Sequence, residues 1–415
     1  MAAGPGLEAL PRSCHRPWQY RRSRQDLDCR FPAPALQSRW EARPWRLDTP
    51  TESGFTRRVN ITLFGYPKTG KTTLFNLVTG AGVEVRAYDD GKREPNVRAV
   101  SLPDGRLDRI AAVYPEKKKI AASTDLTDLV GISFGEVKGS LLLGHLRKAD
   151  GLVHVVRGFE DEDIPHPKGR LDPAEDIRFM EEELVLADLL LADGRLERLE
   201  KDLKKMKDPE GEKERELLQR LRPGLESGRG LRNLPLAPAD EKLIRSFAFL
   251  SLKPLLHVIN MDEKDLVSLR RPEARFPALG ATRRDMAFCG RIENDIAQLE
   301  EGEKPAFMAE YGLDDMSASQ FTGQAVAFLD RISFFTVGKD EVRAWTVKRG
   351  ASAAEAAGAI HSDIAKGFIR AEVVAAEELL RLGSLQHAKE AGAIRLEGKD
   401  YVVRDGDVIY FRFAP

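Results

Sequence analysis

Residues 65–73 have the residue types and spacing of a phosphate-binding loop. The stretch reads Gly-Tyr-Pro-Lys-Thr-Gly-Lys-Thr-Thr, which fits the pattern Gly-x-x-x-x-Gly-Lys-Ser/Thr. Gly65 and Gly70 permit backbone turns that a side chain would block, so that amide N–H groups can point at phosphate oxygens. Lys71 would place a positive charge near the β- and γ-phosphates, and the Thr72 hydroxyl would bind Mg²⁺. The predicted phosphate ligands are the 68–73 amides, those of Lys68, Thr69, Gly70, Lys71, Thr72 and Thr73.

The segments on either side of this loop give it the context that such a motif needs. Val59, Ile61 and Leu63 alternate as in a strand before the loop, and residues 74–78 have helical apolar spacing after it. The alternative is a chance glycine-rich turn between a strand and a helix. The strand, the spacing, the lysine and the threonine are all present together, which favours the phosphate-binding loop.

A second segment offers a metal ligand and a phosphate sensor. Asp128 closes a predicted strand, and Gly131 follows three residues later. Such an aspartate would hold Mg²⁺ through water, and the Gly131 N–H could contact a γ-phosphate. Ile132 stands where many switch NTPases place a water-orienting glutamine. The predicted catalytic residues are therefore Lys71 and Gly131, with Lys68 either as a built-in cation or as a solvent-facing loop residue.

A third segment is predicted to shape the pocket for the base. Asn260, Met261 and Glu263 follow a predicted strand at 254–259, where GTPases carry Asn-Lys-x-Asp. Glu263 is one methylene longer than the aspartate that binds guanine at two points, so guanine selectivity should weaken and adenine becomes admissible. Cys289 and Gly290 lie at the end of the next predicted strand, 286–289, and would line the base. The alternative for Asn260 is a turn residue after a strand.

Length and composition describe a globular protein of two or three domains. The chain has 415 residues, 42% hydrophobic and 32% charged, with a net charge of −1. This charge gives no global attraction to nucleic acid. Its three cysteines lack metal-ligand spacing and fit a reducing compartment. Two roles are possible for Cys289: a redox-sensitive thiol beside the base pocket, or a buried structural thiol.

Residues 1–57 differ in composition from the rest of the chain. They hold seven prolines, three tryptophans and no lysine, and residues 1–58 hold eleven arginines against six acidic residues. We expect a disordered extension. A transit peptide and an RNA-binding arm are the alternatives.

The remaining chain is predicted to form three parts. Residues 58–172 and 251–330 alternate strands and helices, as in a mostly parallel α/β sheet. Residues 173–250 are expected to form an antiparallel helical hairpin, because apolar residues recur every three or four positions, ending at Leu203 and Met206. The alternative is a long helix packed flat on the core. Residues 331–415 read as a small β-rich module with one main helix after Ser352.

The chain resembles the Obg-like ATPase family (YchF type) over about residues 59–415. The likeness rests on the phosphate-binding loop and on segments 94–97, 128–131, 154–157, 159–162, 172–176, 260–263, 341–345, 366–372, 395–401 and 405–408. It implies a P-loop NTPase sheet with an inserted coiled-coil hairpin and a C-terminal TGS-like β-grasp domain. It also implies ATP preferred over GTP, dependence on Mg²⁺, a cytoplasmic location and association with ribosomes.

Three positions depart from the family pattern, and all are expected to face the phosphates. Lys68 replaces an asparagine, Lys92 stands where a switch threonine is expected, and the segment after Gly131 is shorter. An ammonium group cannot coordinate Mg²⁺. We expect these changes to affect hydrolysis more than binding, because the phosphate-binding loop and Asp128 are kept. Two hypotheses follow: an ATPase, or a nucleotide-gated ribosome- or RNA-binding protein with negligible turnover.

The expected partners follow from the resemblance and from local charge. Ribosome association is implied, with RNA contact through the hairpin and the TGS-like domain. Lysines gather near the hairpin turn, although acidic residues interleave them and a solvated helix face explains them equally: Lys201, Lys204, Lys205 and Lys207. The chain is expected to be monomeric and to contain no membrane span. His145 receives no catalytic role.

Overall fold

The computed structural model describes residues 58–84, 94–132, 142–162, 165–166, 168–279 and 286–414. Within these ranges, a six-stranded sheet has the order β2-β4-β1-β5-β6-β7. Its strands are β1 (Asn60–Phe64), β2 (Asn96–Leu102), β4 (Ala122–Asp128), β5 (Gly151–Gly158), β6 (Leu255–Met261) and β7 (Met286–Phe288). Every neighbouring pair is parallel except β2–β4. The carboxyl ends of β1, β4 and β6 therefore meet at one edge of the sheet.

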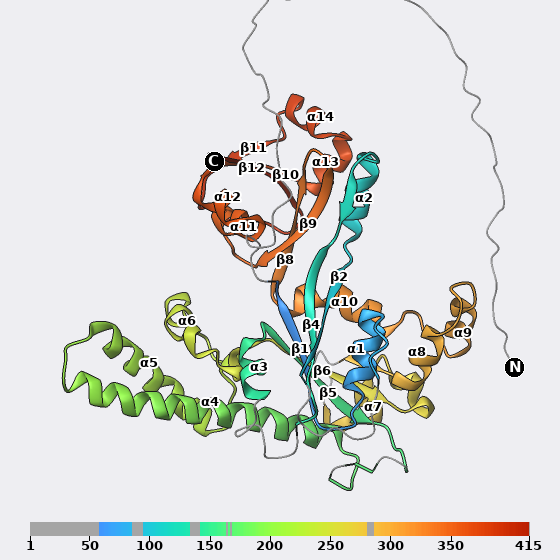
Figure 1. The fold of residues 1–415 in the computed structure, drawn as a ribbon, viewed down its shortest axis with the longest axis vertical. Coiled ribbons are helices and arrows are strands. Elements are labelled where there is room, and N and C mark those ends of the chain that lie inside the picture. The colour runs from blue at the N-terminus through green and yellow to red at the C-terminus, as the bar shows by residue number, and fades with distance from the viewer. Residues whose placement is uncertain are drawn as a thin grey trace, which may run out of the picture. The chain divides into compact units, whose positions relative to one another are not determined.

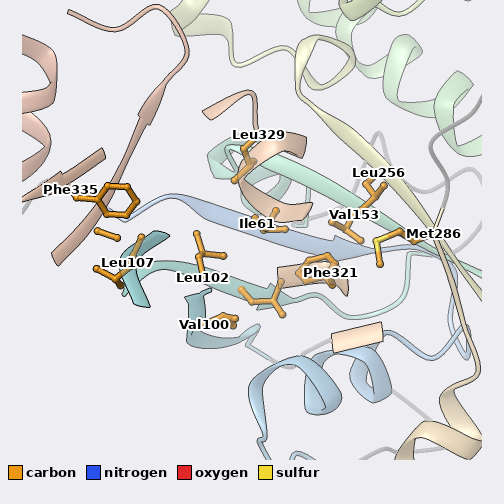
Figure 2. Packing of buried hydrophobic residues seen from close by; sticks show 14 of the residues in the cluster. Ile61, Val100, Leu102, Leu107, Val153, Leu256, Met286, Phe321, Leu329 and Phe335 are labelled. Atoms are coloured by element: carbon orange, nitrogen blue, oxygen red, sulfur yellow. The ribbon is translucent and has the colours of Figure 1, made fainter. Parts of the chain in front are cut away.

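Helices and short 3₁₀ turns connect these strands (Figure 1). They are α1 (Lys71–Thr79), α2 (Gly105–Val113), α3 (Leu142–Lys148), η6 (Glu263–Ser268), α7 (Pro272–Arg275), η7 (Pro277–Leu279), α8 (Gly290–Ala297), α9 (Lys304–Glu310) and α10 (Ser317–Phe328). Apolar side chains from β1, β5, β6 and α10, among them Ile61, Val153, Leu256 and Phe321, pack in one hydrophobic core (Figure 2). This core makes the sheet a rigid support for the loops at its carboxyl edge.

Two long helices form the predicted hairpin. They are α4 (Pro173–Leu203) and α5 (Pro209–Glu226). Asp172 and Asp208 cap them, because each side chain accepts a backbone N–H from the first turn. Arg195 of α4 and Glu214 of α5 join the helices through two bonds of 2.7 and 2.9 Å. The return to the sheet runs through η3 (Leu231–Asn233), α6 (Pro238–Ile244), η4 (Arg245–Phe247) and η5 (Leu250–Leu252).

The structure combines the two alternatives for α4. Its first half packs on the sheet region through Ile177, Met180 and Leu184. Its second half pairs with α5 through Ala192, Leu196 and Leu199, the predicted seam. The prediction was wrong at Met206, which is 71% exposed. The reason is that α4 ends at Leu203, so Met206 lies in the turn rather than on the seam.

The C-terminal part is a second sheet with the order β11-β10-β12-β8-β9-β3. Its strands are β3 (Lys118–Ile120), β8 (Arg331–Val337), β9 (Glu341–Lys348), β10 (Phe368–Ala375), β11 (Arg395–Glu397) and β12 (Asp407–Phe413). The helix expected after Ser352 is α11 (Ala353–Ile360), and Ser352 and Glu355 form a capping box at its start. The expectation of one main helix was wrong, because α12 (Ser362–Lys366), α13 (Ala376–Leu382) and α14 (Leu385–Glu390) are also present. They are too short to give a strong apolar period.

The α/β fold class is confirmed, with a helical insertion and a C-terminal β-sheet part. Strand β3 joins the two sheets. It lies between α2 and β4 in the sequence, but it pairs in parallel with β9 of the C-terminal sheet. No helix among the described residues is long and apolar enough to cross a membrane. Residues 1–57, whose predicted disorder was one of three alternatives, lie outside the described ranges.

Candidate nucleotide-binding site

The loop between β1 and α1 has the backbone geometry that its glycines predicted. Gly65 has φ +143° and Gly70 has φ +94°, both values that favour glycine. A Cβ at Gly65 would lie 2.4 Å from the Val155 carbonyl oxygen, and one at Gly70 would lie 2.2 Å from Asn260 Nδ2. Both positions are therefore closed to any side chain.

Lys71 is held inside the curl of this loop. Its Nζ donates to the Tyr66 carbonyl at 2.7 Å and to the Gly65 carbonyl at 3.3 Å, and the residue is only 6% exposed. The ammonium group is thus fixed among backbone atoms that line the predicted phosphate position. Lys68 adopts the left-handed conformation with φ +62°, which is uncommon for a side chain other than glycine.

Thr72 and Asp128 meet where a divalent cation would be expected. Thr72 Oγ1 donates to Asp128 Oδ2 at 2.9 Å, which joins the start of α1 to the end of β4. A hydroxyl and a carboxylate side by side provide the hard oxygen ligands that Mg²⁺ prefers. These residues, beside the glycine-lined loop, fit a Mg²⁺–nucleotide complex.

Gly131 lies directly against the loop. A Cβ at this residue would be 2.6 Å from Pro67 Cα, and the next residue, Ile132, donates its N–H to the Gly65 carbonyl at 3.0 Å. Ile132 itself is 2% exposed and cannot orient a water molecule. The shortened segment at 133–141 and Lys92 lie outside the described residues.

Asn260 connects the loop to the next segment of the site. Its Nδ2 donates to the Thr69 carbonyl at 3.2 Å, and its Oδ1 accepts the Gly290 N–H at 3.0 Å. The prediction that the strand ends at residue 259 was wrong, since β6 continues to Met261. Extended pairing with β5 as far as Gly158 accounts for the difference. Asn260 is therefore a strand residue and not a turn residue.

The other predicted base-pocket residues differ in their surroundings. Met261 is 2% exposed and packs among apolar residues of the sheet. Cys289 is fully buried and lies directly before α8, one residue past the end of β7, and burial raises the pKa of its thiol. Glu263 is exposed to solvent, and its Oε2 lies 3.7 Å from Arg291 Nε. Gly290 packs against Thr73, since a Cβ there would lie 3.2 Å from Thr73 Cγ2. Their roles toward a base stay predictions.

Two further residues of the site, Asn96 and Asp176, were not predicted from the sequence. Asn96 Nδ2 lies 3.5 Å from Asp128 Oδ2, because Asn96 pairs with Asp128 across β2 and β4. Beside Tyr66 of the loop, the buried Asp176 binds His166 at 3.0 Å and Lys168 at 3.1 Å. The pattern Asp-Pro-Ala-Glu-Asp at 172–176 was a usable signal for Asp176, because it marks the first turn of a capped helix.

Burial raises the pKa of the Tyr66 phenol, and the nearby carboxylates of Asp176 and Glu183 raise it further. The phenol is therefore neutral beside the loop. Lys168 Nζ lies 5.3 Å from the centroid of this ring and 3.9 Å from that of Phe179. Aromatic and charged groups thus surround the first residues of the loop.

Comparison with known proteins places this geometry in a family. Residues 60–191 match the family described as 50S ribosome-binding GTPase, and residues 331–414 match the YchF GTPase C-terminal family, described as a protein of unknown function. The chain is 41% identical to the ribosome-binding ATPase YchF of Bacillus subtilis over 359 residues, which cover 85% of this chain and 98% of the relative. It is 33% identical to Obg-like ATPase 1 of Oryza sativa subsp. japonica over 391 residues, or 92% of this chain and 98% of the relative.

A solved structure agrees with the fold. The Schizosaccharomyces pombe YchF GTPase superposes with a TM-score of 0.71 at 25% identity, covering 86% of this chain and 98% of that one. Both parts of the chain and nearly the full length of these relatives are matched. The chain therefore belongs to the family of YchF and Obg-like ATPases.

Proposed function

We propose that this protein is a Mg²⁺-dependent P-loop NTPase that prefers ATP to GTP and hydrolyses ATP to ADP and phosphate. The observation that supports this most is the meeting of Lys71, the Thr72–Asp128 pair and Gly131 around one glycine-lined loop. Two related proteins are named ribosome-binding ATPases, at 41% and 38% identity.

Each residue has a defined task in this proposal. The 68–73 amides and the Lys71 ammonium bind the phosphates, and Thr72 with Asp128 provides oxygen ligands for Mg²⁺. Bound Mg²⁺ neutralises charge on the phosphate oxygens. Gly131 brings its backbone N–H to the γ-phosphate side of the loop, which no larger residue could do because Pro67 is too close.

The preference for adenine rests on Glu263. Guanine recognition needs a carboxylate that accepts two hydrogen bonds in a fixed geometry. Glu263 is longer than the usual aspartate, and its carboxylate is near the Arg291 guanidinium at 3.7 Å. Both features disfavour guanine. The Asn260 bonds to Thr69 and Gly290 support the pocket from behind.

Two experiments test this proposal. Calorimetric titration with ATP and with GTP, each with Mg²⁺, measures the base preference, and tighter binding of GTP would contradict it. Phosphate release is then compared with a Lys71→Ala control. Turnover at the control level would favour the second hypothesis, a nucleotide-gated binding protein without significant hydrolysis, which the buried Ile132 and the Lys92 substitution support.

Lys68 is proposed as a cation beside the bridging oxygen of the β- and γ-phosphates. The left-handed backbone at this residue sets it apart from its neighbours in the loop. Lys68→Ala and Lys68→Asn should both slow turnover while nucleotide affinity changes less, because the interaction would act in the transition state. Unchanged turnover would leave Lys68 as a solvent-facing residue.

We further propose a monomeric cytoplasmic protein that associates with the ribosome, as the names of its relatives suggest. RNA contact through the hairpin would use the tip lysines, with a second contact on the TGS-like domain, 331–415. Binding to ribosomes should weaken steeply with salt, since each phosphate contact releases counterions. A flat salt response would count against RNA contact. The boundaries 58–172, 173–250, 251–330 and 331–415 stay predictions.

A further inference from the structure

A separate hydrophobic cluster joins the nucleotide site to the base of the hairpin. It contains Tyr66 of the loop, Leu129 and Ile132 on either side of Gly131, and Leu146 of α3. It also contains Met180, Leu184 and Ala187 of α4, and Leu250 of η5. Most of these side chains are at most 2% exposed. Because interiors are close-packed, a shift of one member must be accommodated by the others.

Arg147 adds a polar link from α3 to the same place. Its guanidinium donates to the Phe247 carbonyl at 3.0 Å and lies 3.4 Å from the Ala187 carbonyl. It also lies 3.8 Å from the carboxylate of Asp188, which is fully buried. One side chain of α3 therefore contacts both α4 and the segment that returns from the hairpin.

Asp188 completes the link. Its two oxygens accept the N–H groups of Leu250 and Ser251 at 2.9 and 2.7 Å. Lys253 follows η5, and its Nζ donates to the carbonyl of Ala149, the residue directly after α3. The end of α3, the middle of α4 and η5 are thus fixed to one another by charged hydrogen bonds that burial strengthens. We call Arg147, Asp188 and Lys253 the hairpin anchor.

We propose that the hairpin anchor couples the nucleotide state to the helical hairpin, so that the hairpin binds its ribosomal partner in one nucleotide state better than in the other. This regulation rests on the proposed nucleotide-binding function. The loop and the Gly131 segment pack in the cluster with α3, and α3 cannot move alone without breaking the Arg147 bonds. A change at the γ-phosphate side therefore moves the base of the hairpin, and its tip about 18 residues away along α4 moves further.

Hydrogen exchange measured by mass spectrometry on the full chain tests the coupling. Exchange in residues 185–226 and 245–253 is compared with ADP and with a non-hydrolysable ATP analogue. We expect the ratio of the exchange rates in the two states to differ from one, by up to about 5- to 150-fold if the hairpin feels the full coupling that is typical between linked binding sites. Arg147→Met should reduce that ratio toward one, while calorimetry shows nucleotide affinity within about threefold of the wild type. The reason is that the polar contacts of Arg147 within the described residues lead to α4 and to the segment that returns from the hairpin.

Arg195→Met is the matched control. It removes an arginine of the hairpin that bonds Glu214 and leaves α3 untouched. It should preserve the dependence of exchange on nucleotide. Arg147→Lys keeps the charge and tests whether the several carbonyl bonds are needed; if Arg147→Met fails to fold, Arg147→Lys serves as the test variant and should show partial loss of coupling.

The outcomes separate the two proposals. Nucleotide binding with identical hairpin exchange in both states would overturn the coupling and leave the proposed function intact. Equal coupling in the wild type and in the folded Arg147 variant would remove Arg147 from the link. Failure of the wild type to bind either nucleotide would overturn both proposals.

Discussion

Glycine at residues 65, 70 and 131 determines how close the backbone of this site can approach its neighbours. At each residue a Cβ would lie within 2.6 Å of an atom of another segment. Polar side chains then hold the neighbouring segments together by hydrogen bonds. Thr72 donates to Asp128, and Asn260 donates to the Thr69 carbonyl. At this scale, the residue type follows from the space and the hydrogen bonds available.

Thr72→Val should weaken Mg²⁺-dependent nucleotide binding. The variant removes the hydroxyl that bonds Asp128 and leaves a methyl group of similar size. The same hydroxyl would be lost as a ligand of Mg²⁺, and an interaction with a charged group contributes about 1.5–3 kcal/mol, which corresponds to roughly 10- to 150-fold in affinity. Calorimetry with and without Mg²⁺ measures the effect. Thr72→Ser should restore most of it, and equal affinities of the Val and Ser variants would contradict the metal role.

Gly131→Ala should reduce the preference for ATP over ADP. The new Cβ would lie 2.6 Å from Pro67 Cα and 2.7 Å from Pro67 N, backbone atoms that cannot easily move away. The segment must therefore retreat from the loop, and its N–H would leave the γ-phosphate side. The ratio of ATP to ADP affinity measures this. Gly144→Ala is the control, because nothing lies within 4 Å of a Cβ there. A similar ratio in both variants would contradict the sensor role.

The helices gain their positions from buried polar contacts between elements as well as from apolar packing. Glu293 of α8 shows this, because its Oε2 accepts the N–H of Ser317 at the start of α10 at 2.7 Å. The side chain is only 2% exposed. One carboxylate thus satisfies a helix N-terminus that would otherwise leave a buried N–H without a bond. Burial also raises the pKa of Glu293 above its ordinary value of 4.5.

The raised pKa of Glu293 predicts how stability depends on pH. The folded protein holds this proton more tightly than the unfolded chain does, so the contribution of Glu293 to the free energy of unfolding falls as pH rises. The fall begins near pH 4.5, the ordinary value, and ends above the raised pKa. Glu293→Gln should flatten this part of the profile while its amide oxygen keeps the Ser317 bond. Urea unfolding at several pH values measures both profiles, and identical slopes would refute the assignment.

The two sheets of the molecule are joined by backbone and by charge. Strand β3 pairs with β9, and Lys117 Nζ donates to the Gly338 and Lys339 carbonyls at 2.8 and 3.0 Å. Arg106 of α2 binds Asp104 at its own helix start and Asp405 of the C-terminal part at 2.9 Å. Asp405 in turn accepts the Ser333 N–H of β8 at 2.9 Å. Relative motion of the two parts would break the β3–β9 pairing and these hydrogen bonds and ion pairs together.

Arg106→Met should lower the stability of the C-terminal part against urea by about 1–3 kcal/mol, because it leaves Asp104 and Asp405 without their charged partner. The helix cap remains, since Asp104 accepts the backbone N–H of residue 106. Arg109→Met is the matched control on the same helix. Its pair with Glu377 is largely exposed and should contribute less than about 1 kcal/mol. Equal losses in the two variants would show that Arg106 does not join the parts.

Much of the fold and part of the site could be predicted from the sequence, because those features depend on local periods and spacing. Residues 60–79 show strand, loop and helix in direct succession, and the cap at Ser352 is a pattern of four residues. The end of β6 could not be predicted, because pairing with β5 extends it to Met261. The short helices α12–α14 and strand β3 also depend on neighbours that are distant in the sequence.

The sequence by itself determined that a phosphate-binding loop follows a strand, that Asp128 and Asn260 belong to its surroundings, and that a helical hairpin interrupts the sheet. These follow from residue types at fixed spacing, which constrain the local backbone directly. Only the tertiary structure decided that Asn260 bridges Thr69 and Gly290, that Met261 and Cys289 are buried, and that Arg147 reaches the hairpin. The hydrogen bonds among these contacts join residues 30 to 191 positions apart, and no local period records such separations.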